Sequence, residues 1–369
     1  EELFRYARIS EHGPHGNQAA AFVKLLLQAS AQDDLPIYVV LTMRSDYLGD
    51  CSKFWGLPEA INKGQYLIPR LTRDQRREAI MGPIGLRGAK LSAQLVNQLL
   101  NDMGDDPDQL PILQHALMRT WDSWEQDKDP QAPIDVQHYA AIGRMAEGLS
   151  IHADEAYDEL PDERSCKIAE RMFRSLTERG TGHVETRRPT RMNEIQAITE
   201  ATFKELVSVI DVFRKEGRSF LMPPQSKELE DDTLIDISHE SLIRNWKRMK
   251  EWVNQEAKSA DVYRRLVESA RLHQKGDAGV LSDQEIHSAL RWKDENKPNV
   301  AWASRYHLGL RRISTLATNN ANGQPAIISD LEIFEDAMGF LEKSQAASRR
   351  KARTRKLTKA LIAASVLLV

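Results

Sequence analysis

The amino-acid sequence predicts a mainly α-helical protein with a partial α/β piece near its start. Apolar residues recur with helical spacing over most of the 369 residues. One short apolar run, residues 35–44, is instead rich in β-branched side chains, which favours a buried strand. Hydrophobic residues make up 41% of the chain and charged residues 28%, which is typical of globular rather than disordered proteins. The length is sufficient for two or three domains.

The α/β piece is predicted for residues 1–69. Residues 17–31 have the spacing of an amphipathic helix, and the run LPIYVVLTMR follows at 35–44. A strand that is apolar on both faces is typical of a parallel sheet, because helices cover both faces of such a sheet. The helix and the strand together therefore predict one α/β layer.

A small helical domain is predicted for residues 70–134. Thr72 begins a capping box, and the Gly-Pro pair at residue 82 predicts the end of this helix. Ser92 is the predicted N-cap of the next helix, residues 93–103.

The third helix of this domain is predicted to begin at Pro111, because a proline lacks the N–H that the first helical turn leaves unpaired. The helix has one apolar stripe. The stripe consists of Leu113, Leu117, Trp121 and Trp124.

A winged-helix domain is predicted for residues 135–257. Three helices are expected first, near residues 137–158, 162–178 and 193–216. Two short apolar segments, 219–224 and 233–238, then flank a charged stretch, which predicts a β-hairpin or wing. The helix after this hairpin has its apolar residues on one stripe: Leu242, Ile243, Trp246, Met249 and Val253.

A mainly helical linker domain is predicted for residues 258–348, followed by a basic juxtamembrane segment and an apolar end within 349–369. Seven basic side chains occupy residues 349–359, and without them the chain has 44 basic and 54 acidic side chains. The uncharged run 360–369 predicts the start of a transmembrane helix whose basic flank lies in the cytoplasm. A short buried tail or an amphipathic end is the alternative.

The cysteines, the histidines and the net charge limit the functions that the chain can have. Cys51 and Cys166 have no metal-like spacing, and the two alone indicate a reducing compartment. The ten histidines form no HxxxH or HExxH pair, so no metal site is predicted. The acidic body argues against a nucleic-acid partner, which needs a basic surface. Because the chain opens on Glu1 rather than on a methionine, we expect an internal fragment.

Four motifs resemble those of a known family. They are EELF at residues 1–4, LTMRSDYL at 41–48, LPILQHAL at 110–117 and IDISHESLIRNW at 235–246. Their order and spacing resemble the bacterial novel STAND NTPases, which are AAA-like signalling ATPases often fused to WD-repeat domains. The resemblance extends from the first residue to about residue 344.

The resemblance implies a role for five residues. Glu1 and Glu2 follow the position of the Walker B aspartate, so either is a candidate for placing the attacking water. Arg44 corresponds to an arginine that senses the γ-phosphate. Pro111 corresponds to the lid proline near the adenine, and His239 to a winged-helix histidine that contacts the diphosphate.

Three of these residues also have a purely structural alternative. Arg44 would pair with Asp46 at a strand end, Pro111 would only start a helix, and His239 would only cap one. In the first turn of its helix, the His239 imidazole is expected to be neutral and still able to donate one hydrogen bond to phosphate.

The implied function is a nucleotide-dependent signalling switch with ATP or ADP and Mg²⁺ as cofactors. ADP would hold the protein closed through His239, and ATP would open it and allow self-association. The full-length protein would be a slow ATPase. Residues 1–69 resemble only the C-terminal part of a P-loop NTPase core, without the GxxxxGK[ST] loop or the Walker B aspartate, so the fragment alone is expected to be inactive.

The same resemblance, with the apolar end of the chain, places the protein on the cytoplasmic face of the bacterial inner membrane, with sensor and effector domains that the sequence does not identify. Two other functions stay open. One is a nucleotide-blind membrane scaffold, and the other is a winged-helix regulator that binds DNA.

Overall fold

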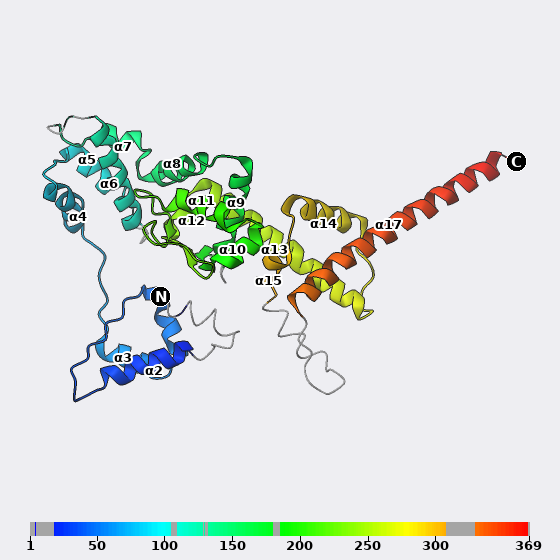
Figure 1. The fold of residues 1–369 in the computed structure, drawn as a ribbon, viewed down its shortest axis with the longest axis horizontal. Coiled ribbons are helices and arrows are strands. Elements are labelled where there is room, and N and C mark those ends of the chain that lie inside the picture. Colours follow the sequence, from blue (N-terminus) through cyan, green and yellow to red (C-terminus); the bar gives the residue numbers. More distant parts are fainter. Residues whose placement is uncertain are drawn as a thin grey trace. The chain divides into compact units, whose positions relative to one another are not determined.

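The computed structural model of the protein describes the backbone of Phe4 and of residues 18–104, 109–127, 129, 132–179, 185–307 and 329–367. The chain divides into two compact units, Glu1–Asp74 and Gln75–Val369. Both consist mainly of helices, and the strands that are described lie in the second unit (Figure 1). The prediction of a mainly α-helical protein is therefore confirmed.

The first unit contains α2 (Gln18–Ser30), the 3-10 helix η1 (Ser45–Lys53) and α3 (Leu57–Gly64). The helix predicted at residues 17–31 is therefore confirmed as α2. The core of this unit is small, with Phe4 stacked on Tyr47 at 5.6 Å between ring centroids. Its buried residues are Phe4, Ala19, Val23, Cys51, Phe54 and Leu57.

Residues 35–44 do not form the predicted strand. They have no regular secondary structure, and they pair with no strand in the part of the chain that the structure describes. Tyr38 is 89% exposed and Val40 is 83% exposed. A strand needs a neighbouring strand for its N–H and C=O groups, and the apolar composition of a segment does not supply one. The prediction of an α/β layer in residues 1–69 is therefore wrong for the described residues.

The next three helices are α4 (Arg73–Leu86), α5 (Ala93–Asp102) and α6 (Gln109–Gln126). Ser92 caps α5 as predicted, because its Oγ accepts the N–H of Leu95 at 3.1 Å. The predicted helix end at residue 82 is wrong, since α4 continues through Pro83. The last turn buries Ile84 in the core that the three helices share, and this burial offsets the hydrogen bond that the proline removes.

One helix predicted at residues 137–158 is in fact two, α7 (Val136–Ala141) and α8 (Arg144–Asp158). Gly143 separates them with φ 84°, a left-handed conformation that favours glycine. Helix α7 and the first turn of α8 complete the core of α4–α6 through Tyr139, Ile142 and Met145.

The helix predicted at 162–178 is confirmed as α9 (Glu163–Ser175), and it is followed by the antiparallel pair β1 (Thr177–Arg179) and β2 (Glu185–Arg187). The polar sequence of this pair gave no strand prediction. The helix predicted at 193–216 is two helices, α10 (Met192–Thr199) and α11 (Phe203–Arg214). Glu200, with φ 57°, ends the first of them.

The predicted hairpin is confirmed. The strands β4 (Leu221–Met222) and β5 (Leu234–Ile237) pair antiparallel, with Leu221 opposite Ile237. On its other edge β5 pairs with β3 (Thr190–Arg191), so the strand order is β3–β5–β4.

Helices α12 (Glu240–Asn245) and α13 (Lys247–Gln274) follow the hairpin. The fully buried Trp246 lies between them, and its ring packs 5.1 Å from the ring of Phe173 on α9. This second core combines apolar side chains of α8, α9, α11, β4, β5 and α12 with the first half of α13.

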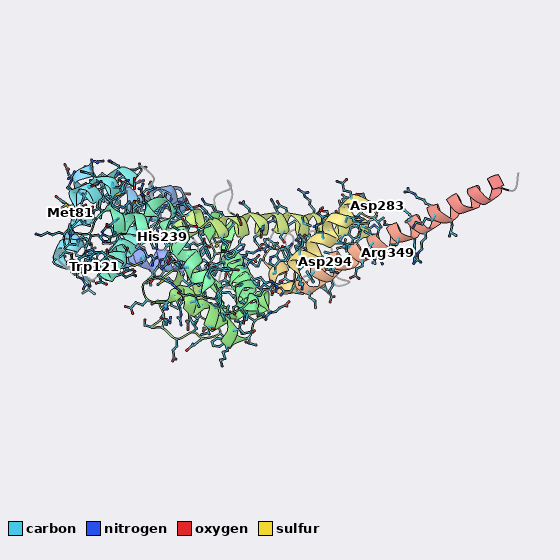
Figure 2. All side chains as sticks on the ribbon, turned by 90° about the horizontal axis from the view of Figure 1, so that it is seen from above. Met81, Trp121, His239, Asp283, Asp294 and Arg349 are labelled. Carbon is cyan, nitrogen blue, oxygen red and sulfur yellow. The ribbon has the colours of Figure 1, made fainter. Side chains whose placement is uncertain are left out.

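The second half of α13 belongs to a third core, around the buried Tyr263. This core also contains α14 (Asp283–Asn296), α15 (Val300–Ser304) and the first turns of α17 (Asp330–Leu367). Helix α17 then continues past α14 (Figure 1), and Arg349 lies on that part of it (Figure 2).

The predicted start of a transmembrane helix is not supported, and the membrane localisation that depended on it is contradicted. Among the described residues, no helix combines the length and the apolar character that crossing a bilayer requires. Helix α17 has 38 residues, but the basic stretch 349–359 lies inside it, and only residues 360–367 of the apolar end belong to it. A bilayer requires about 20 consecutive apolar residues.

Candidate functional site

The five residues predicted from the sequence lie in different places. Glu1 and Glu2 lie outside the described residues. Arg44 lies in the first compact unit, whereas Pro111 and His239 lie in the second. The last two are therefore the predicted pair whose surroundings define a candidate site.

Arg44 is half-buried at the junction between segment 35–44 and η1. Its carbonyl oxygen accepts the N–H of Tyr47 at 3.1 Å. The side chain of Asp46, its alternative partner, lies outside the described residues. Arg44 is therefore at the start of a 3-10 helix, not at the end of a paired strand.

Pro111 lies in the first turn of α6, as predicted, and is half-buried. The two residues after it, Ile112 and Leu113, are buried in the core of α4–α8. The burial of these two side chains fixes the rotation of α6 about its axis, and with it the position of Pro111. One turn further along, the same helix carries His115.

His239 caps α12 rather than lying in its first turn (its position on the ribbon is labelled in Figure 2). Its Nδ1 accepts the backbone N–H of Ser241 at 3.1 Å, and the Ser241 hydroxyl lies 3.0 Å from the same nitrogen. Because Nδ1 is an acceptor, the neutral imidazole carries its proton on Nε2. The predicted single helix after the hairpin is thus divided at Trp246, and the histidine begins the shorter part.

A pair of histidines connects the Pro111 helix to the hairpin. The Nε2 of His115 on α6 lies 2.9 Å from Nδ1 of His152 on α8. The ring of Phe220, just before β4, packs edge-on against His152 at 5.0 Å and also lies 6.3 Å from the His115 ring. The carbonyl oxygen of Phe220 accepts the N–H of Ser238, the residue next to His239. A continuous chain of contacts therefore leads from α6 to the start of α12.

Both imidazoles of this pair are held in the neutral form. Burial lowers the pKa of His115 from 6.5 to about 4, and the charge of Arg119 adds to the effect. Burial likewise lowers the pKa of His152 to about 3, with further contributions from Arg119, His115 and Arg218. At neutral pH one ring donates its N–H and the other accepts it, so the pair forms a hydrogen bond between two neutral rings, of which His152 is buried and His115 half-buried.

Helix α8 bridges the two halves of this region. On one side, both carboxylate oxygens of its Glu155 accept from Nη2 of Arg119 on α6, at 3.0 and 2.8 Å. On the other side, its Asp154 accepts the indole N–H of Trp246 and the Nε–H of Arg248, both at 2.9 Å. The Ser150 hydroxyl of the same helix accepts the N–H at the start of α13 at 3.2 Å.

Sequence reasoning missed this bridge. His115 is part of the LPILQHAL motif, so the motif was a signal that α6 carries functional residues. His152, however, lies 37 residues away on a helix without any recognised motif. Pairs of this kind depend on which helices pack together, and the spacing of residues along one helix does not contain that information.

The order of the four motifs along the chain, on a mainly helical fold with a small sheet, is consistent with a signalling protein of the STAND NTPase class. The chain belongs to the Novel STAND NTPase 1 family, whose sequence model matches residues 1–279. No curated protein and no solved structure matches the chain. Membership of this family implies nucleotide binding and a role in signalling. Residues 280–369, which include α14, α15 and α17, lie beyond the matched range.

Proposed function

We propose that this chain is the switching part of a nucleotide-dependent signalling ATPase, in which Pro111 lies against the adenine and His239 binds the phosphates of ADP. The observation that carries the proposal is the bridge between the two elements. The His115–His152 hydrogen bond and the Phe220–Ser238 hydrogen bond join the helix of Pro111 to the cap that His239 forms. A ligand held by both residues would therefore stabilise one arrangement of α6, α8 and α12.

The chemistry of His239 supports a phosphate contact. Its Nδ1 is occupied as the cap of α12, which orients the ring and leaves the proton on Nε2. An Nε2–H can donate to a phosphate oxygen without carrying a full charge. A charge-assisted hydrogen bond of this kind is stronger than a neutral one, so the ring would discriminate between the diphosphate of ADP and the differently placed phosphates of ATP.

The proposed movement occurs within α8. Met145 in its first turn belongs to the core of α4–α7, whereas Leu149 and the residues after it belong to the core that contains Trp246. Among the described residues, the hydrogen bonds and ion pairs between α6 and the later turns of α8 are the His115–His152 bond and the Arg119–Glu155 pair. Polar groups that separate can form hydrogen bonds to water instead, so their separation costs little. Separating a hydrophobic core costs more, because it exposes apolar surface to water. We call these two polar contacts the polar joint. The winged-helix part, proposed as residues 135–257, would therefore move away from the helical lid, residues 70–134, by breaking the polar joint.

The remaining roles follow the family pattern. Arg44 is proposed to sense the γ-phosphate, and Glu1 or Glu2 to orient water in slow hydrolysis, with self-association in the ATP state. Magnesium would neutralise phosphate charge when it is bound. Within the residues that the structure describes, no group of three His, Cys, Asp or Glu side chains is placed to hold a metal ion, so none of them is assigned to Mg²⁺.

The test is the affinity for ADP and for ATP, measured by calorimetry on the longest natural polypeptide that contains these residues. His239→Ala should weaken ADP by roughly tenfold or more, which is the value of a hydrogen bond to a charged group, and should weaken ATP less. His287→Ala is the matched control, because His287 is exposed on α14. Equal loss for both nucleotides would refute the proposed role of His239. No binding of either nucleotide to the unmodified protein would favour a nucleotide-blind scaffold.

A further inference from the structure

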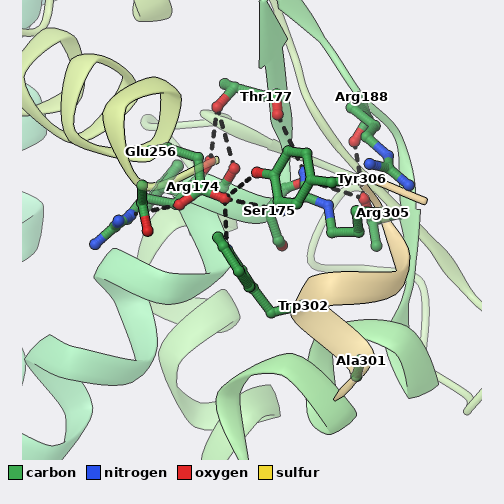
Figure 3. A network of polar contacts seen from close by, with 12 residues as sticks. Arg174, Ser175, Thr177, Arg188, Glu256, Ala301, Trp302, Arg305 and Tyr306 are labelled. Atoms are coloured by element: carbon green, nitrogen blue, oxygen red, sulfur yellow. Dashed lines mark hydrogen bonds and ion pairs between the residues drawn. The ribbon is translucent and has the colours of Figure 1, made fainter. Parts of the chain in front are cut away.

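A buried carboxylate holds together three helices in the second unit. Glu256 on α13 accepts the Nε–H of Arg174 on α9 at 2.9 Å and the indole N–H of Trp302 on α15 at 2.8 Å. The hydroxyl of Tyr306 donates to the same carboxylate (Figure 3). Both oxygens of Glu256 are thus already used as acceptors.

Arg305, next to this carboxylate, is a buried cation with too few acceptors. Arg305 is 7% exposed, and its Nη2 donates to the carbonyl oxygens of Ser175 and Thr177 at 2.9 and 3.1 Å. Among the residues that the structure describes, no hydrogen-bond acceptor lies within reach of its Nε or Nη1. Glu256 Oε1 lies 3.5 Å from Nη1, which makes an ion pair but not a hydrogen bond. Leaving guanidinium N–H groups buried without acceptors is costly, so this site is incomplete.

A cavity of about 30 Å³ adjoins these groups. Four cationic side chains line it against the single carboxylate of Glu256. They are Arg171, Arg174, Lys297 and Arg305. Of these, Arg174 has a second carboxylate partner, Glu170, at 3.1 Å, whereas Arg171 donates to the backbone carbonyl oxygens of Ile198, Asn296 and Lys297. The lining therefore has an excess of positive charge.

The same cavity has an excess of hydrogen-bond donors. Ser259 is buried and its Oγ accepts the indole N–H of Trp292 at 2.6 Å, but its hydroxyl proton has no acceptor among the described residues. Lys297 is exposed at the rim, so the cavity is accessible from solvent. Three kinds of hydrogen-bond donor thus line one cavity: a guanidinium, a hydroxyl and an ammonium group.

We propose that this cavity binds a phosphate group, with Arg305 as its principal ligand and Ser259 and Lys297 as further donors. An oxyanion would supply the acceptors that Arg305 lacks and would neutralise the excess charge. A tetrahedral oxyanion suits donors that converge from different elements, whereas a planar carboxylate suits a single fork. A cavity of this size holds about two water molecules, and the compact oxygen tetrahedron of one phosphate occupies a similar space.

The position of the cavity gives the bound phosphate a structural effect. Arg171 and Arg174 belong to α9, in the core that contains Trp246, while Lys297 and Arg305 flank α15, in the third core. The phosphate would lie between these two cores, beside the guanidinium groups of Arg171 and Arg174, and would stabilise the packing of α15 near α9. None of the residues proposed to contact nucleotide lines this cavity, so the inference does not depend on the proposed function.

The test is phosphate binding followed by ³¹P NMR line broadening and by the thermal midpoint of the chain, at constant ionic strength. The unmodified protein should bind inorganic phosphate saturably and melt at a higher temperature with it. Arg305→Met should weaken binding by about tenfold or more, and Lys297→Asn by a smaller factor. Asparagine is chosen because residue 297 has a positive φ of 42°, which asparagine tolerates. Lys258→Asn is the matched control, since Lys258 is exposed beside Ser259 but does not line the cavity.

Glycerol phosphate distinguishes two sources of the same chemistry. Tighter binding of glycerol phosphate than of inorganic phosphate, with the same dependence on Arg305, would identify a phosphomonoester as the ligand, and the reverse order would identify free phosphate. If Arg305→Met fails to fold, Lys297→Asn and Lys258→Asn still give the comparison. Absence of saturable binding, or equal binding by all folded variants, would overturn the proposal and leave the cavity as a site for water.

Discussion

The pair of His115 and His152, of which the first is half-buried and the second buried, should make the second unit sensitive to mild acid, and replacing the pair should remove that sensitivity. We would replace both His115 and His152 by leucine, which fills a similar space without a titratable group. Both partners of the 2.9 Å hydrogen bond are removed together, so neither is left buried without a partner. The change should therefore be nearly neutral at about pH 7.

The size of the effect follows from the pKa values. In the unfolded chain both imidazoles have an ordinary pKa near 6.5, and in the folded chain burial lowers these values to about 4 and about 3. Below pH 6.5 the unfolded state takes up protons that the folded state does not, so the free energy of unfolding falls as the pH falls. The loss begins near 6.5 and is complete only below the folded pKa values. At about pH 5 it amounts to about 2 kcal/mol for each histidine, or about 3–4 kcal/mol for the pair.

The assay is urea unfolding followed by tryptophan fluorescence at about pH 7 and about pH 5. The quantity to compare is the loss of unfolding free energy between the two pH values. It should be smaller by about 3–4 kcal/mol in the double leucine variant than in the unmodified protein. The exposed His287, replaced by leucine, is the control and should leave the loss unchanged. An equal loss in all three proteins would show that the pair is not neutral and buried in the way described.

Two further changes test the packing of the second unit. Trp246→Ala should lower the free energy of unfolding by about 3–5 kcal/mol in urea titrations, because the fully buried ring would leave a cavity beside Phe173 and Asp154 would lose its indole partner. Ser282→Ala should cost about 1 kcal/mol, since Ser282 and Glu285 form the capping box of α14, and amide hydrogen exchange should speed up in the first turn of that helix more than elsewhere. A uniform change in exchange would contradict the second expectation.

Local features of the fold were predictable, and the reasons are physical. Ser92 caps α5 because a hydroxyl accepts an N–H three residues away, which requires nothing beyond the local sequence. The β4–β5 hairpin likewise depends on two short segments and the charged stretch between them. Pro83 was misjudged because the burial of Ile84 in a shared core decides whether the helix continues, and that core is assembled from distant helices.

The candidate site was predictable only in part, for the same reason. The motifs located Pro111 and His239 on the correct kinds of element, a helix start and a strand-to-helix junction. The bridge between them was not predictable, because His152 and Phe220 reach His115 through the packing of α8 and the hairpin. Arg305 gave no signal at all, since an arginine in sequence is ordinarily exposed and its burial follows from the position of α15.

Helix α13 determines how far a movement of the winged-helix part would travel. Trp252 in its first half is buried in the core around Trp246, and Tyr263 in its second half is buried in the core with α14, α15 and α17. The two residues lie on one uninterrupted helix of 28 residues, so the first half cannot rotate without displacing the second. The hydrogen bonds that Glu256 accepts from Arg174 and Trp302 reinforce this connection, because they join α9 and α15 to the middle of α13. A swing at the polar joint between α6 and α8 would therefore carry α14, α15 and the start of α17 with it, and the signal would leave the matched family region through packed helices rather than through a flexible linker.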